Sequence, residues 1–168
     1  MEAIFTRRSV RRYKDKSVEK EKIDRLLRAA MQAPSAGNQC PWEFIVVQDK
    51  ERLAKLSMTS PYAKLCKEAP LVFVLLSNMK NLRFPEHWEQ DMGAATENIL
   101  LEAVHLNLGS VWLGVAPAID RIKYLCELFE LPEHIQPYCL ISIGYPLDEK
   151  SNYFIDRYDE MKVHYEKF

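Results

Sequence analysis

One segment of the chain, residues 85–108, constrains the possible folds more than any other. It is the longest stretch with helical periodicity, and its apolar residues form two stripes: Met92, Ala95, Ile99 and Leu106 on one, and Ala94, Leu101 and Val104 on the other. A helix that is apolar on two sides has to be covered on both of them. We expect a β-sheet to cover one stripe and a second protomer to cover the other, with Gly109 ending the helix.

Strands and further helices alternate around this segment. Short runs rich in β-branched and aromatic residues predict strands at 42–49, 70–78 and 138–146, and SVWLGVAP, which starts at Ser110, predicts a strand or a loop. Helical spacing predicts a short N-terminal helix and further helices at 17–33, 50–58, 62–68 and 118–130, with Ser17 as the N-cap of the first of these four. Without a repeat, low-complexity tract or linker, residues 1–168 are expected to form a single domain.

Composition and charge argue against several classes of protein. Hydrophobic residues make up 48% of the chain and charged residues 28%, which is typical of a globular protein rather than a disordered one. A net charge of −1 leaves no basic footprint for nucleic acid. The longest apolar run, 71–76, is too short to span a bilayer, and the four cysteines lack metal-ligand or disulfide spacing. We expect a cytoplasmic protein with free thiols and neither a nucleic-acid nor a membrane partner.

An arginine-rich hexapeptide, RRSVRR at residues 7–12, is the first candidate binding element. The chain has no GxGxxG or GxxxxGK sequence, so a phosphate would have to be held by side chains. The planar guanidinium group of arginine matches phosphate geometry and stays charged at physiological pH, and Ser9 adds a hydroxyl donor. Taken alone, the same cluster is more readily explained as a solvated basic turn.

A second candidate element, PSAGNQCPW at residues 34–42, directly follows a predicted helix. Two prolines bracket small residues that allow the backbone to approach a flat ligand, and Asn38 offers a donor and an acceptor to the edge of a heteroaromatic ring. The alternative is an ordinary loop that precedes a buried tryptophan. Neither element is specific when it is considered alone.

Together the two elements resemble the nitroreductase family of flavin enzymes. The family pattern is an early Arg-x-Ser-x-Arg, then a helix, then a Pro-Ser-x-x-Asn-x-x-Pro-Trp loop that runs into a strand. In this chain the matching residues are Arg7, Ser9, Arg11, Pro34, Ser35, Asn38, Pro41 and Trp42. The later stretches GSVWLG and IGYP and a late arginine extend the resemblance over nearly the whole chain.

The resemblance implies a fold and an assembly. The fold would be α+β and nitroreductase-like, with a mostly antiparallel central sheet flanked by helices. The assembly would be an intertwined homodimer built on the long helix. Residues 147–168, which are polar, aromatic and rich in charge, would form an extended C-terminal arm that reaches across the partner.

The resemblance also implies an FMN site made by both protomers. Arg7, Arg8, Ser9 and Arg11 would hold the FMN phosphate and the pyrimidine edge of the ring, and Arg157 would be a late phosphate contact. Pro34, Ser35, Ala36 and Asn38 of the other subunit would line the flavin, and the backbone around Leu113 and Gly114 would lie near N5. A cation near N1 favours the reduced flavin, a role that we assign to Arg11, with Arg8 as the alternative.

Several other residues attract attention but receive structural interpretations. His105 is expected to be an interface or core residue, and Cys40 a small buried packing residue rather than a redox group. The acidic residues of the long helix lack a Glu-x-x-His partner, so no metal site is predicted. Three features depart from the family pattern. Leu113 stands where many family members carry an acidic residue, and Lys64 is only a possible contact to the site. The segment between Asn78 and Asp91, where larger members insert helices over the active site, is short in this chain.

The resulting prediction is an FMN-dependent oxidoreductase that takes hydride from NADH or NADPH and then reduces a second acceptor by a ping-pong mechanism. The acceptor could be a nitroaromatic, a quinone, free flavin or dioxygen, and no catalytic side chain is needed because the flavin carries the chemistry. Two alternatives stay open. One is a flavin-binding redox sensor without nicotinamide turnover, and the other is a family relative with enone-reducing, dehalogenating or flavin-destroying chemistry.

Overall fold

A four-stranded antiparallel sheet forms the centre of the molecule, with the strand order β1-β2-β4-β3. The computed structural model describes residues 2–168. The strands are β1 (Trp42–Val47), β2 (Leu71–Asn78), β3 (Gly109–Gly114) and β4 (Ile135–Gly144). The predicted α+β architecture with an antiparallel sheet is therefore confirmed, and SVWLGVAP supplies most of a strand rather than a loop.

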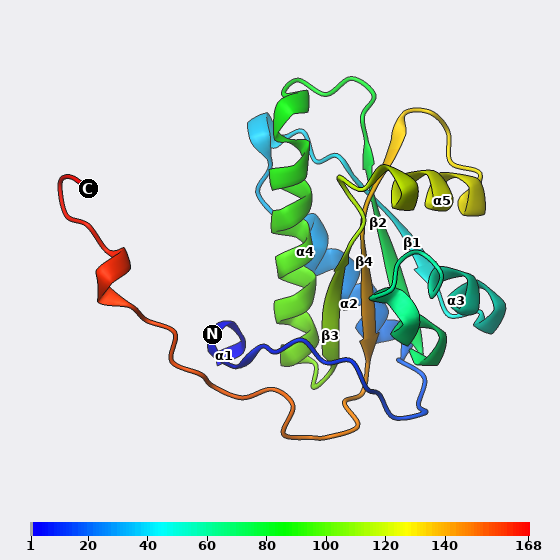
Figure 1. Cartoon of the computed structure of the whole chain (residues 1–168), viewed down its shortest axis with the longest axis horizontal. Helices are drawn as coiled ribbons and strands as arrows, with labels where there is room; N and C mark the ends of the chain where they lie inside the picture. Colours follow the sequence, from blue (N-terminus) through cyan, green and yellow to red (C-terminus); the bar gives the residue numbers. More distant parts are fainter. Residues whose placement is uncertain (1) are drawn as a thin grey trace.

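Helices cover both faces of the sheet (Figure 1). On one face lie α2 (Lys20–Met31) and α4 (Trp88–His105), and on the other lie α3 (Lys50–Leu56), the 3₁₀ helix η2 (Ala63–Glu68) and α5 (Ile119–Phe129). A short α1 (Glu2–Thr6) packs against α4. Three further 3₁₀ turns are η1 (Ala36–Asn38), η3 (Pro85–His87) and η4 (Glu160–Lys162).

The central strand β2 explains the continuous apolar run in the sequence. Its side chains alternate between the faces, so that Phe73 packs against the helices α2 and α4 while Val72 and Val74 pack on the opposite side. All of these side chains are fully buried, because both faces of β2 are covered. A strand buried on both faces has no polar side, which is why the sequence shows no alternation.

The two stripes of α4 have different surroundings. The residues of the first stripe, Met92, Ala95, Ile99 and Leu106, are buried against the sheet and α2 of their own chain. The residues of the second stripe, Ala94, Leu101 and Val104, are only partly buried within one chain. This second stripe is therefore available to a further partner.

Several helix boundaries differ from the prediction, among them the two for which a cap or stop residue was named. Helix α2 begins at Lys20, and the preceding Glu19 makes no side-chain capping bond, so Ser17 is not its N-cap. Helix α4 ends at His105, and the left-handed turn after it is taken by Asn107, with φ of 58°, rather than by Gly109. Gly109 serves a different purpose, because a Cβ there would lie 2.6 Å from the Cβ of Val10. The glycine lets the arginine-bearing segment approach β3.

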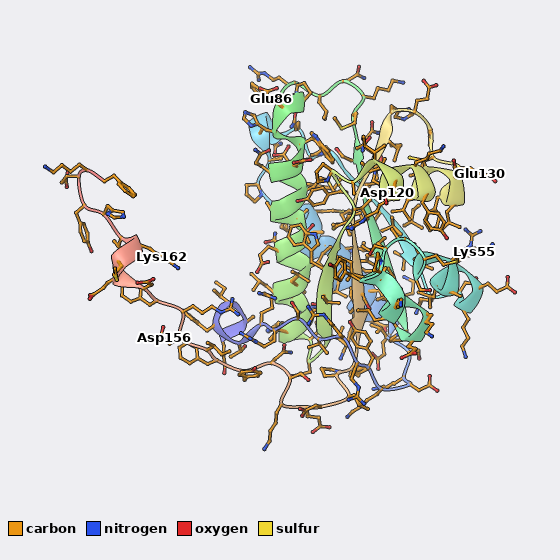
Figure 2. All side chains as sticks on the ribbon, viewed as in Figure 1. Lys55, Glu86, Asp120, Glu130, Asp156 and Lys162 are labelled. Carbon is orange, nitrogen blue, oxygen red and sulfur yellow. The ribbon has the colours of Figure 1, made fainter. Side chains whose placement is uncertain are left out.

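Beyond β4 the chain leaves the sheet and runs alongside the N-terminal segment before it extends away from the body of the molecule (Figure 1). Asp156 and Lys162 lie on this arm, far from the sheet (Figure 2). Large apolar side chains on the arm are exposed, among them Phe154 at 59% and Tyr158 at 74%. None of the helices formed by residues 2–168 combines the length and the apolar character of a bilayer-spanning segment.

Candidate functional site

The arginine-bearing segment is fastened to the edge of the sheet. The backbone N–H of Val10 donates to the carbonyl of Ser110 in β3 over 2.9 Å, and Ser9 forms a parallel bridge with the same residue. The hydroxyl of Tyr13 lies 2.7 Å from the carbonyl oxygen of Val10 and 3.1 Å from that of Ser142. Burial raises the pKa of Tyr13, so this hydroxyl stays protonated and keeps its donor role. Segment 7–12 thus has a defined place beside β3.

This segment and the start of the C-terminal arm line an open hollow of about 790 Å³. Its lining residues are Arg7, Arg8, Ser9, Val10, Arg11, Arg12, Leu147, Asp148, Lys150, Ser151, Tyr153 and Arg157. Six of them are basic and one, Asp148, is acidic. The hollow therefore carries a strong local excess of positive charge in a chain whose net charge is only −1. We refer to it as the arginine hollow.

Three arginines of the hollow make specific contacts, and those of Arg8 join the segment to the arm. The guanidinium group of Arg8 lies over the ring of Tyr153, 4.8 Å from its centroid, and the backbone N–H of Arg8 donates to Oδ1 of Asn152 over 3.2 Å. Arg7 makes an ion pair with Glu97 on α4, with Nε and Oε1 3.5 Å apart. Arg11 donates to the carbonyl of Ser9 over 3.3 Å. The structure thus brings five predicted residues together, namely Arg7, Arg8, Ser9, Arg11 and Arg157.

The loop at residues 34–40 lies elsewhere, against the beginning of α4. The backbone N–H of Ala36 donates to Oδ1 of Asp91 over 2.8 Å. Pro34 and Asn38 are exposed, and Ser35 and Ala36 are partly exposed. Within residues 2–168, none of these four lines the arginine hollow. One chain therefore presents two separate halves of the predicted site.

Leu113 and Gly114 end strand β3. The Leu113 side chain is buried in the core between the sheet and α5, so only its backbone is available to a ligand. Gly114 is exposed, and a Cβ added there would have no neighbour within 4 Å. Arg121, which the sequence analysis did not single out, donates from Nη1 to the Gly114 carbonyl over 2.8 Å. This end of β3 is thus an open backbone edge held by an arginine.

The family model of the nitroreductases, described as "Nitroreductase family", matches residues 4–60 and 56–145, which is most of the chain. The chain belongs to the nitroreductase family. The resemblance drawn from the arginine segment and the proline-bracketed loop is therefore confirmed.

Other family members align with this nitroreductase-family chain over nearly its whole length. A protein of Archaeoglobus fulgidus, provisionally named NADH dehydrogenase/NAD(P)H nitroreductase, is 45% identical over 170 residues, covering 100% of this chain and 98% of its own. A Clostridium acetobutylicum crystal structure, provisionally named NADH oxidase, has a TM-score of 0.96 at 57% identity and 99% coverage of both chains. An FMN-dependent nitroreductase of Clostridium difficile R20291 has a TM-score of 0.88 at 39% identity and 96% coverage of both.

One residue of this family member, Cys40, differs from its expected role. Cys40 is exposed rather than buried, so the prediction of a buried packing residue is wrong. Its backbone takes a φ of 47°, its N–H donates to the Ser35 hydroxyl over 3.0 Å, and its Sγ lies 3.6 Å from the Asn38 carbonyl oxygen of the same loop. His105 was expected to be an interface or core residue; it is exposed at the last position of α4, so it is not a core residue, and the interface role stays a prediction.

Three acidic residues of α4 make ion pairs or hydrogen bonds to other segments. Glu97 pairs with Arg7, and Glu102 pairs with Arg25 of α2 over 2.7 Å. Asp91 binds the 34–40 loop. In the part of the chain that the structure describes, no group of three His, Cys, Asp or Glu side chains is arranged to hold a metal ion. The sequence analysis missed the bond from Asp91 to the loop, because periodicity does not report contacts between distant segments.

Proposed function

We propose that this protein is an FMN-dependent oxidoreductase that takes hydride from NADH or NADPH and passes it to a second substrate. The observation that carries this proposal is the arginine hollow, in which six basic residues from the two ends of the chain face one space. The names of the relatives support the same class, since they include NAD(P)H nitroreductase and FMN-dependent nitroreductase. Bound FMN would supply the hydride chemistry, and the protein would supply position and electric field.

The donors of the arginine hollow match a phosphate dianion. The guanidinium groups of Arg7, Arg8 and Arg157 offer paired N–H donors that bind two phosphate oxygens at once, and the Ser9 hydroxyl adds another donor. Asp148 accepts the backbone N–H of Lys150 over 2.9 Å, so this acidic group is partly engaged. In this proposal Arg11 directs positive charge toward the ring and stabilises its reduced, negatively charged form.

In this proposal, the remaining cofactor contacts come from a second protomer and from the end of β3. Pro34, Ser35, Ala36 and Asn38 of a second protomer line the flavin, and the backbone of Leu113 and Gly114 lies near N5. The flat, exposed edge at Gly114 supports this assignment, because the ring can approach the backbone there without meeting a side chain. Arg121 keeps the Gly114 peptide in one orientation through its bond to the carbonyl.

A homodimer completes the site in this proposal. The partly exposed second stripe of α4 and the exposed aromatic residues of the arm supply apolar surface for a second copy. The separation of the 34–40 loop from the arginine hollow has the same explanation, because the loop of one protomer then serves the hollow of the other. We further propose that residues 1–168 form one FMN-binding domain and that the protein is cytoplasmic.

The reaction follows a ping-pong order in this proposal. The nicotinamide and the acceptor use the same face of the flavin in turn, so the oxidised nicotinamide leaves before the acceptor binds. The acceptor is a nitroaromatic, a quinone, free flavin or dioxygen. No side chain acts as an essential acid or base, since the cofactor carries the electrons.

Spectroscopy tests the proposal directly. FMN is added to the purified protein, and the visible spectrum is recorded before and after anaerobic addition of NADH or NADPH. We expect bound-flavin bands that bleach, and parallel double-reciprocal plots when the acceptor is varied in steady-state assays. Flavin that binds but does not bleach with either nicotinamide would favour a redox sensor. Absence of FMN binding would refute the proposed function.

A further inference from the structure

A buried carboxylate at the start of α4 grips the loop that we place on the flavin. Asp91 is only 4% exposed, although aspartate is rarely buried without partners. Its Oδ1 accepts the backbone N–H of Ala36 over 2.8 Å, and its Oδ2 accepts Nε2 of Gln39 over 2.6 Å. Both carboxylate oxygens therefore bind donors of the 34–40 loop.

Gln39 extends this contact to a third segment. Its Nε2 also donates to the carbonyl of Phe84 over 3.0 Å, and its Oε1 accepts the backbone N–H of Phe84 over 3.0 Å. The amide of Gln39 thus satisfies both backbone polar groups of one residue, as a neighbouring strand would. Asp91 and Gln39 together join the loop, the segment just before α4 and the first turn of α4, close to Glu86 at one end of the molecule (Figure 2).

The loop itself has a conformation that needs such support. Gly37, Asn38 and Cys40 have φ angles of 54°, 57° and 47°, and positive φ is costly for the two residues that are not glycine. At Gly37 an added Cβ would lie 2.5 Å from Cε2 of Phe84, so the Phe84 ring packs directly on the loop backbone. A backbone with several left-handed residues keeps one shape only when outside contacts determine it.

We propose that Asp91, acting through Ala36 and Gln39, is a positioning residue that holds the 34–40 loop in the shape that contacts FMN. This inference rests on the proposed function, in which that loop lines the flavin of the partner protomer. The carboxylate is required because it accepts at both oxygens. An asparagine would present an N–H₂ group to one of the two donors, and Oε1 of Gln39 is already occupied by Phe84. The loop would then lose one of its anchors.

The test compares Asp91→Asn with Glu89→Gln. Glu89 lies in the same first turn of α4 but is exposed, so its substitution removes the same charge without touching the loop. FMN affinity is measured by quenching of flavin fluorescence, and the unfolding temperature of the flavin-free protein is measured in parallel. We expect Asp91→Asn to bind FMN at least about tenfold more weakly than Glu89→Gln, since a hydrogen bond to a charged group is lost. At saturating FMN, the visible circular dichroism of the bound flavin should also change in Asp91→Asn alone.

A structural role without positioning predicts a different pattern. In that case Asp91→Asn would lower the unfolding temperature but leave the FMN affinity and the circular dichroism equal to those of Glu89→Gln, which would overturn the inference. If Asp91→Asn does not fold, Gln39→Met keeps the side-chain length, removes the amide contacts and gives the same comparison, with the same affinity loss expected. A wild-type protein that binds no FMN overturns the proposed function and this inference together. Wild-type binding with an unaffected variant overturns the inference alone.

Discussion

Replacement of Arg157 by alanine is the sharpest test of the arginine hollow. Arg157 is exposed on the C-terminal arm, so its removal creates no cavity in the core. Arg7 is less suitable, because it also pairs with Glu97 and its loss would leave that carboxylate on α4 without its partner. The Arg157→Ala variant therefore measures the contribution of one hollow-lining cation.

The expected magnitude follows from the electrostatics of an open site. Two unit charges 4 Å apart interact by about 1 kcal/mol in water and by about 4 kcal/mol near a protein surface. Because Arg157 is exposed, we take the lower part of this range, about 1 to 2 kcal/mol, which corresponds to FMN binding about fivefold to thirtyfold more weakly. Salt screens such a contact, so the difference between wild type and variant should shrink as ionic strength rises.

The assay is a fluorescence titration of FMN at fixed ionic strength. Arg157→Lys should lie between wild type and Arg157→Ala, since lysine keeps the charge but not the paired donors. Arg52→Ala is the matched control, because Arg52 is exposed on α3, on the opposite face of the sheet from α4. Equal FMN affinities of Arg157→Ala and Arg52→Ala would refute the assignment of the arm to the site.

Three further predictions address the assembly, the thiols and a surface carboxylate. Leu101→Arg places a charge on the partly exposed stripe of α4. Light scattering should then report a monomer, and this monomer should bind FMN poorly. An intact dimer that binds FMN normally would exclude this interface. When the folded protein is treated with a thiol reagent, Cys40 should react fast because it is exposed, whereas two of the other three thiols are fully buried. Rapid modification of several thiols would contradict this packing. The hydroxyl of Tyr145 donates to Glu19 over 2.6 Å and lowers the pKa of Glu19 to about 2. This contact stabilises the fold above about pH 4.5 and loses its effect as the pH falls toward 2. Tyr145→Phe should therefore move the Glu19 pKa up toward 4.5, which a carboxyl NMR titration measures. An unchanged Glu19 pKa would refute the contact.

The placement of Ile99 shows both what periodicity predicts and what it leaves open. Its helical spacing predicted a buried stripe, and the structure buries Ile99 completely in the core of its own chain. A charge at this position would therefore unfold the protomer, and only the second stripe can test the dimer. Periodicity identifies both stripes, but it does not reveal which one faces the sheet, because both are apolar.

The sequence by itself determined the elements with a local cause. The β-branched runs predicted three strands, the two-stripe pattern predicted the long helix, and the order of the arginine segment and the proline-bracketed loop identified the family. Each of these signals comes from neighbouring residues, whose spacing and backbone preferences are written in a short window. The helix boundaries were less accurate, since capping depends on contacts that a window does not contain.

Only the tertiary structure decided which distant groups meet. Gln39 and Asp91 are separated by 52 positions, and Arg8 and Asn152 by 144, yet both pairs form hydrogen bonds. Antiparallel pairing and the packing of α4 against the sheet bring these segments together, and the closure of such long loops leaves no local pattern in the chain. The arginines were visible in the sequence because their charge is a local property. The hollow that they line exists only because the arm returns to them after β4.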